Sequence, residues 1–211
     1  MGYYVRVLSR SDAVPSYGTL REALGGRDLL LVEGADEEWT ELIIQHEGVD
    51  IALVDRVTIV SDTMGAGEIE WFLEQLDEAE PASAADWLRD YLPQVKTIYA
   101  LRILSAAWEE DRFDHVSKVR QTIWRAAGGI LQADHEGFTN EEGYQILWQF
   151  ADDVDGDWWM AVLENGIWRH FRMDLGNPEH RKAFKAGKVP SEIGRGILGI
   201  ARSLFQPFRK Q

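Results

Sequence analysis

The sequence predicts an α+β protein, with a ferredoxin-like N-terminal half and a C-terminal half made of a helix and an antiparallel β-meander. Three observations predict this class. Alternating apolar runs indicate strands in both halves, and apolar residues at helical spacing indicate helices between them. The dipeptides Asp155-Gly156 and Asn165-Gly166 indicate hairpin turns. Helices interrupt the strands up to residue 104, whereas strands follow one another after residue 129, and this pattern is typical of α+β proteins.

Five segments of the first half are rich in apolar and β-branched residues, so we predict that they are strands. They are Tyr3–Leu8, Asp28–Glu33, Trp39–His46, Ile51–Val60 and Val95–Leu104. Residues 39–46 would also fit one face of a helix, but Glu47-Gly48 favours a hairpin turn into the following strand.

Three helices are predicted between these strands. Thr19 is predicted to cap a short helix over Leu20–Leu24. Apolar residues at i, i+3, i+4 and i+7 predict a second helix over Ile69–Leu76. Ser83 and Asp86 predict a third helix that ends at Leu92, which Ser83 caps in a capping-box-like start. The order β-α-β-β-β-α-α-β predicts a ferredoxin-like, split β-α-β sheet with one extra strand.

The second half begins with a helix and continues with four strands and a short helix. The predicted helix is Asp111–Ala127, and the predicted strands are Gly129–Gln132, Tyr144–Phe150, Trp158–Leu163 and Ile167–Met173. Asn177 is the predicted N-cap of the last helix, with Pro178 at its first position and its end at about Ala186. The last three strands form the predicted meander, because both hairpin signals lie between them.

We expect three parts in the chain: residues 1–106, residues 107–190 packed on the first part, and a basic tail at 191–211. No linker rich in proline, glycine or serine separates the two halves. The tail has an amphipathic pattern, but its glycines each cost about 1 kcal/mol in a helix. Docking on the protein, disorder, binding to a partner and contact with a membrane surface stay open for the tail, and we regard the membrane as unlikely.

The composition excludes several classes of function. The net charge of −14 argues against nucleic acid as a partner. The chain has no cysteine, which excludes disulfides, thiolate metal sites and cysteine nucleophiles. We find no nucleotide-binding or hydrolase motif, so we predict no cofactor and no bound metal. The first residues do not have the pattern of a signal peptide, and we expect a cytoplasmic protein of unknown oligomeric state.

The charge is distributed unevenly. Residues 1–168 hold 12 basic and 33 acidic side chains, whereas residues 169–211 hold 10 and 3. Between Arg125 and Arg169 there are nine acidic side chains and no basic one. This acidic span favours a basic protein as a partner, because opposite charges speed encounter.

The long polar segment Asp134–Gly143 is the first candidate site, because loops of this size are often functional. Its carboxylates Asp134, Glu136, Glu141 and Glu142 are the candidate contacts for a basic partner. An alternative is a metal-dependent hydrolase that uses Asp134, His135 and Glu136, because these side chains bind divalent metals and transfer protons. Neighbouring residues of an extended segment point to opposite faces, which disfavours this alternative.

Two adjacent tryptophans, Trp158 and Trp159, are candidate anchors for a partner. Successive side chains of a strand point to opposite faces, so only one of the two can face the core. An aromatic side chain beside an acidic loop is typical of binding hot spots. The alternative is that another part of the chain covers the second face.

Three segments carry a resemblance to known proteins: GGILQADHEGFTNEEGYQILWQF, WWMAVLENGIW and FRMDLGNPEHRKAF. With them the chain resembles a group of bacterial proteins of unassigned function, over most of its length up to about Pro190. In type it is also similar to immunity proteins that neutralise secreted toxins, since it is acidic, rich in tryptophan and free of cysteine. This similarity implies a protein-binding function and assigns no individual residue.

The sequence thus favours a non-enzymatic bacterial protein that binds another protein, for which an immunity-type inhibitor of a basic toxin is the concrete hypothesis.

Overall fold

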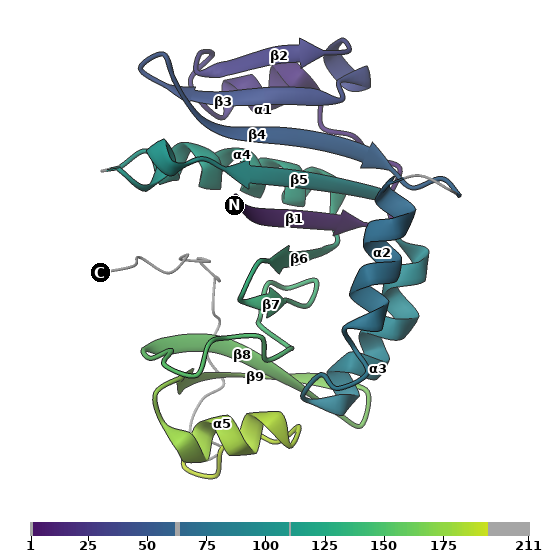
Figure 1. The fold of residues 1–211 in the computed structure, drawn as a ribbon, viewed down its shortest axis with the longest axis vertical. Coiled ribbons are helices and arrows are strands. Elements are labelled where there is room, and N and C mark those ends of the chain that lie inside the picture. Colours follow the sequence, from purple (N-terminus) through teal and green to yellow (C-terminus); the bar gives the residue numbers. More distant parts are fainter. Residues whose placement is uncertain (1, 62–63, 110, 194–211) are drawn as a thin grey trace. The chain divides into compact units, whose positions relative to one another are not determined.

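We describe a computed structural model of the chain, which covers residues 2–61, 64–109 and 111–193 (Figure 1). Helices and antiparallel sheets both form, so the predicted α+β class is confirmed. The described residues divide into two compact units. Unit 1 comprises residues 2–67 and 95–134, and unit 2 comprises residues 68–94 and 135–193. The predicted boundary at residue 106 lies inside the second segment of unit 1, before a helix whose apolar side is buried in that unit.

Unit 1 is built on an antiparallel sheet in the order β2-β3-β4-β5-β1-β6. Its strands are β1 (Tyr3–Ser9), β2 (Leu29–Glu33), β3 (Glu41–His46), β4 (Val49–Thr58), β5 (Thr97–Ile103) and β6 (Ile130–Ala133). Strand β1 is an inner strand, with Val5 opposite Leu101 of β5 on one side and Ala133 of β6 on the other. Val5, Leu101 and Ala133 are all buried, as expected for strands in the middle of a sheet.

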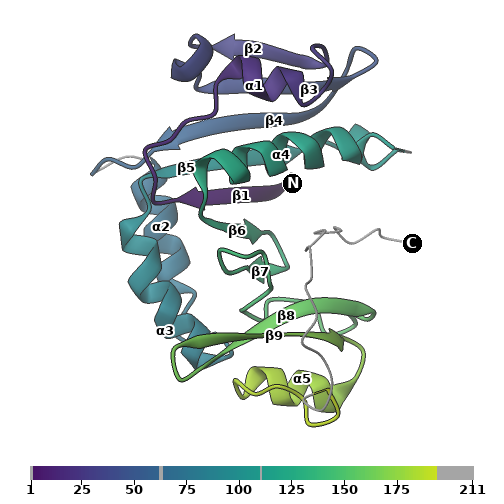
Figure 2. The same ribbon diagram turned by 180° about the vertical axis from the view of Figure 1, so that it is seen from behind.

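Helices α1 (Tyr17–Glu22) and α4 (Phe113–Ala127) lie together on one face of this sheet (Figure 2). Helix α4 buries Val116, Val119 and Ile123, which recur at helical spacing. It ends at Gly128, whose φ of 67° is in the left-handed region that favours glycine. Helix α1 begins earlier than predicted, and Ser16 caps it in place of Thr19 by accepting a hydrogen bond from the Thr19 backbone N–H. The short 3₁₀ helices η1 (Asp36–Glu38) and η3 (Ser105–Trp108) complete the unit.

The strand order differs from a ferredoxin-like arrangement. In a split β-α-β sheet, a helical connection joins two parallel strands that have another strand between them. Here β4 and β5, which flank residues 59–96, are direct antiparallel neighbours over seven residue pairs, from Ala52↔Ile103 to Thr58↔Thr97. The helical segment therefore joins the adjacent antiparallel strands β4 and β5. Its length would also suit a crossover between parallel strands, so the sequence could not distinguish the two connections.

Unit 2 contains most of α2 (Met64–Glu74), α3 (Ala82–Tyr91) and the 3₁₀ helix η2 (Leu92–Gln94). It also contains β7 (Gly137–Phe138), β8 (Asp157–Glu164), β9 (Ile167–Asp174) and α5 (Pro178–Lys185). Helix α3 begins after Pro81, and no side chain caps it, so the predicted capping by Ser83 is wrong. Asn177 caps α5 as predicted, with Pro178 in its first turn.

The core of unit 2 lies against one face of the β8–β9 hairpin. The buried residues of this core are Phe150, Val154, Met160, Val162, Phe171, Met173, Leu175 and Phe184. Phe184 is the buried residue of α5, so this helix covers the hairpin. Ile193, the first apolar residue of the predicted tail, packs against the same core. The rest of the tail, from residue 194, lies outside the described residues.

The predicted meander is shorter than expected. Strands β8 and β9 pair from Asp157↔Asp174 to Glu164↔Ile167, around the Asn165-Gly166 turn. The predicted strand at Tyr144–Phe150 is wrong, because this segment forms only isolated bridges at Gln145. Gln145 pairs with Met160 in the parallel sense, through bonds to the backbone of Trp159 and Ala161. Within residues 2–61, 64–109 and 111–193, no helix is both long and apolar enough to cross a membrane.

Candidate functional site

Asp134 is part of the sheet of unit 1. Its backbone N–H donates to the carbonyl of Tyr4 (3.0 Å), and its carboxylate accepts from the Tyr4 N–H (3.0 Å). The same carboxylate accepts a hydrogen bond from Arg6 Nη1 at 2.7 Å. Arg6 is buried and also donates to Gln132. Asp134 thus neutralises a buried cation at the end of β6, which is a structural role.

His135 and Glu136 have different surroundings. His135 is exposed and has a φ of 64°, so it is a turn residue. Glu136 is only 3% exposed, and its carbonyl accepts a hydrogen bond from Gln145 Nε2. One of the three predicted hydrolase residues is therefore paired with an arginine, one is exposed and one is buried. The geometry gives no support to the hydrolase alternative.

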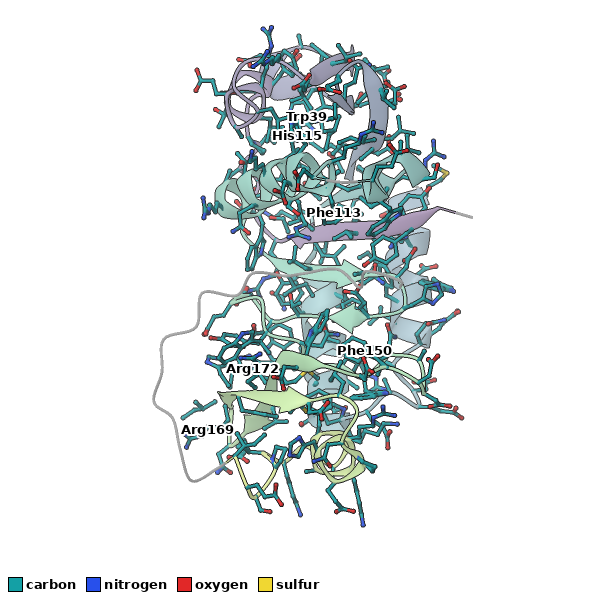
Figure 3. The ribbon with its side chains drawn as sticks, turned by 90° about the vertical axis from the view of Figure 1, so that its left-hand side faces the viewer. Trp39, Phe113, His115, Phe150, Arg169 and Arg172 are labelled. Carbon is teal, nitrogen blue, oxygen red and sulfur yellow. The ribbon has the colours of Figure 1, made fainter. Side chains whose placement is uncertain are left out.

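The described residues contain no group of three or more histidine and acidic side chains placed to hold a metal. This includes the aspartates of residues 152–157, which alternate in the sequence like calcium ligands. Asp157 instead pairs with Arg172 of β9 at 3.0 Å. Figure 3 labels Arg172 on this strand.

The second part of the acidic loop is organised by Asn140. Its side-chain oxygen accepts hydrogen bonds from the backbone N–H groups of Glu142 (3.1 Å) and Tyr144 (2.9 Å). Gly143 closes the turn with a φ of 85° and donates to the Asn140 carbonyl. Asn140 is buried, whereas Glu141 and Glu142 are exposed. A fixed turn therefore presents these two carboxylates to solvent.

Glu142 reaches the β8–β9 hairpin through His170. Its Oε2 atom lies 3.1 Å from His170 Nε2. The His170 ring stacks on Tyr144, with 3.9 Å between centroids and 2° between planes. Burial, and secondly the charge of Glu142, raise the pKa of Tyr144 above its usual value. We call Glu141, Glu142, Tyr144, Trp159 and His170 the hairpin surface.

The two adjacent tryptophans point to opposite faces of β8, as the alternation predicted. Trp158 packs against the core of unit 2 and lies edge-on to Phe150 at 5.5 Å. Trp159 lies on the other face and makes an edge contact with Tyr144, with ring centroids 6.2 Å apart. Both side chains are half-buried. Because only Trp159 lies on the face of Tyr144 and His170, it belongs to the hairpin surface and Trp158 does not.

The second face of the hairpin is also partly covered. Trp168, on the same face as His170, packs edge-on against Trp87 of α3 at 5.3 Å. Ala161 lies on this face between the Trp168–Trp87 contact and the Trp159–Tyr144 contact, and it is fully buried. The open part of this face is therefore the end near Glu142, Trp159 and His170.

The sequence analysis missed Tyr144 and His170. The signal for His170 was present, because a two-residue turn at Asn165-Gly166 pairs Glu164 with Ile167 and hence Ala161 with His170. Trp159 and His170 then lie on one face by alternation. No such signal existed for Tyr144, because its segment is not a regular strand.

Comparisons with protein-family models, with curated proteins and with solved structures found no match for the chain.

Proposed function

We propose that the protein is a non-enzymatic binding module for a basic protein and that the hairpin surface makes the contact. An immunity-type inhibitor of a basic toxin is the concrete form of this proposal, and such an inhibitor would act in the bacterial cytoplasm. The observation that carries it is the Glu142–His170–Tyr144 arrangement, which holds an exposed carboxylate beside aromatic rings.

The carboxylate of Glu142 is preorganised. Its backbone is fixed by Asn140, and its side chain lies against an imidazole that is itself stacked. Binding a lysine or arginine through such a group costs less side-chain entropy than binding through a mobile glutamate. Glu141, next to it on the same turn, adds a second negative charge.

The aromatic rings supply the apolar part of the contact. Trp159 is half-buried and Tyr144 supports the His170 ring from beneath. Binding hot spots combine aromatic anchors with charged groups near them. The net charge of −14 adds long-range attraction for a basic partner and makes association depend on salt.

The test begins with a phage library of random peptides, selected against the full chain at low salt. The best peptide is synthesised, and its affinity is measured by calorimetry for the wild type and two double variants. One is Glu141→Lys with Glu142→Lys, and the other is Asp152→Lys with Asp153→Lys. Both pairs are exposed, belong to unit 2 and change the net charge equally.

We expect a lysine- or arginine-rich peptide, and a loss of affinity of at least about tenfold for the first variant, or roughly 1.4 kcal/mol. The affinity of the second variant for the peptide should fall by about threefold or less, because only the long-range attraction changes. Equal losses in both variants would mean that net charge alone drives binding, and the proposal would fail. Selection of acidic or uncharged peptides would also contradict it.

A further inference from the structure

Unit 1 has a sheet face that α1 and α4 leave uncovered over β2, β3 and β4. Both helices lie on the opposite face, and Figure 1 shows these three strands in front of them. On the helix side, Leu42, Ala52 and Val54 are fully buried. Their neighbours Ile43 and Leu53 point the other way by alternation, whereas Ile51 of β4 is fully buried. This second side of β2–β4 is called the open face.

An apolar row crosses the open face. Leu30 pairs with Ile43, and Ile43 pairs with Leu53, so the three side chains lie side by side on adjacent strands. Leu30 is 45% exposed, and Val32, farther along β2, is 49% exposed. Ile43 and Leu53 are half-buried. Contiguous exposed apolar side chains of this kind often indicate a binding surface.

A row of carboxylates runs beside the apolar row. Glu41 pairs with Asp55, so two acidic residues lie side by side on β3 and β4. Glu33 of β2 lies opposite Glu41 beyond a register shift, and its carboxylate accepts a hydrogen bond from the Thr40 hydroxyl. Like charges directly opposite each other on neighbouring strands destabilise a sheet. Burial raises the pKa of Asp55, and Arg102 of β5 offsets part of this effect. The row thus has an energetic cost that a cationic partner would remove.

We propose that the open face binds an amphipathic helix of a partner protein, with an apolar stripe flanked by lysine or arginine. The stripe contacts Leu30, Ile43 and Leu53, and the basic flank contacts Glu41 and Asp55. The spacing suits a helix, because its pitch of about 5.4 Å is close to the distance of about 4.8 Å between strands. A helix about 10 Å wide covers both rows.

A second copy of this chain fits the open face less well. A symmetric contact between two open faces would bring Glu41 and Asp55 of both copies together, and like charges disfavour that contact. The proposal concerns unit 1 and does not depend on the hairpin surface of unit 2. Either one can fail alone.

The test uses the full chain with labelled leucine, isoleucine and valine methyl groups. The probe is a synthetic helix of leucine and lysine about four turns long, with a leucine–glutamate helix of the same pattern as control. We expect the lysine peptide to shift the methyl signals of Leu30, Val32, Ile43 and Leu53. Replacing Glu41→Gln together with Asp55→Asn should weaken its binding about tenfold. The matched pair Asp152→Asn with Asp153→Asn should change it less than about twofold.

Four results would overturn the proposal. The first is methyl shifts confined to unit 2, and the second is equal binding of the leucine–glutamate helix. The third is a dimeric free chain that Leu53→Glu converts to a monomer, because a second copy would then occupy the face. The fourth is quenching of the Ile43 and Leu53 signals in the free chain by a spin label at Ser203→Cys, which would assign the face to the chain's own C-terminal segment. The absence of native cysteine makes this label specific.

Discussion

The acidic segment between residues 134 and 142 has two ends with different roles. At its start, Asp134 pairs with the buried Arg6 and with the backbone of Tyr4 in the sheet of unit 1. At its end, the side chain of Glu142 is exposed, and its Oε2 atom lies 3.1 Å from His170 Nε2. Both residues are carboxylates in one loop. Asp134 is a structural residue and Glu142 is a candidate contact because their partners and their burial differ, although both are carboxylates.

The largest expected effect comes from removing the structural carboxylate. Asp134→Ala removes the ion pair between Asp134 and the buried Arg6, and it removes an acceptor for the Tyr4 N–H. We expect the free energy of unfolding to fall by about 3 kcal/mol, as for other buried pairs that lose one partner. Glu142→Ala should change it by about 0.5 kcal/mol or less, because the side chain is exposed. Urea unfolding of both variants gives this comparison, and equal effects would refute the distinction.

A smaller effect is expected at the turn that presents Glu142. Asn140→Ala removes the acceptor for two backbone N–H groups and should lower the free energy of unfolding by about 1–2 kcal/mol. Asn140→Asp keeps the acceptor and should restore most of the loss. Hydrogen exchange of the Glu142 and Tyr144 amides should accelerate in the alanine variant only. If both variants behave alike, the turn is held by other groups.

The arrangement of the hairpin surface predicts the ionisation of one tyrosine. Burial and the charge of Glu142 raise the pKa of Tyr144, so its phenol should ionise above the usual range near pH 10. Glu142→Gln removes the second cause and should lower this pKa toward the usual value, while burial keeps it raised. NMR titration of labelled tyrosine rings measures the change. No change would mean that Glu142 does not lie near this ring.

The smallest effect concerns the pH dependence of unit 1. Burial lowers the pKa of His115, and the neighbouring His46 and Lys118 act in the same direction, while Asp28 opposes them. The unfolded chain therefore binds a proton more readily, so this contribution to stability is complete above about pH 6.5 and is lost as the pH falls below it. His115→Gln should flatten the decline in the melting temperature between about pH 7 and pH 5. A wild-type melting temperature that rises as the pH falls from about 7 to 5 would contradict the predicted direction of the pH dependence.

The sequence allowed the fold class and the tight hairpin to be predicted, because both depend on local patterns. Asn165-Gly166 fixes the register of β8 and β9. The strand order of unit 1 could not be predicted, because the pairing of Thr97–Ile103 with both β1 and β4 depends on contacts distant in sequence. Of the candidate site, Glu142 and Trp159 could be named, whereas Tyr144 could not. Its place depends on the buried side chain of Asn140, which sequence patterns treat as an ordinary loop residue.

Hydrogen–deuterium exchange of the full chain, with and without the selected basic peptide, tests the central contrast most directly. We expect slower exchange at residues 141–144 and 168–172 in the complex, and unchanged exchange at residues 130–134, where Asp134 has its structural role. Protection at 130–134 without protection at 141–144 would contradict this account, because the structural end of the loop would then be the binding end.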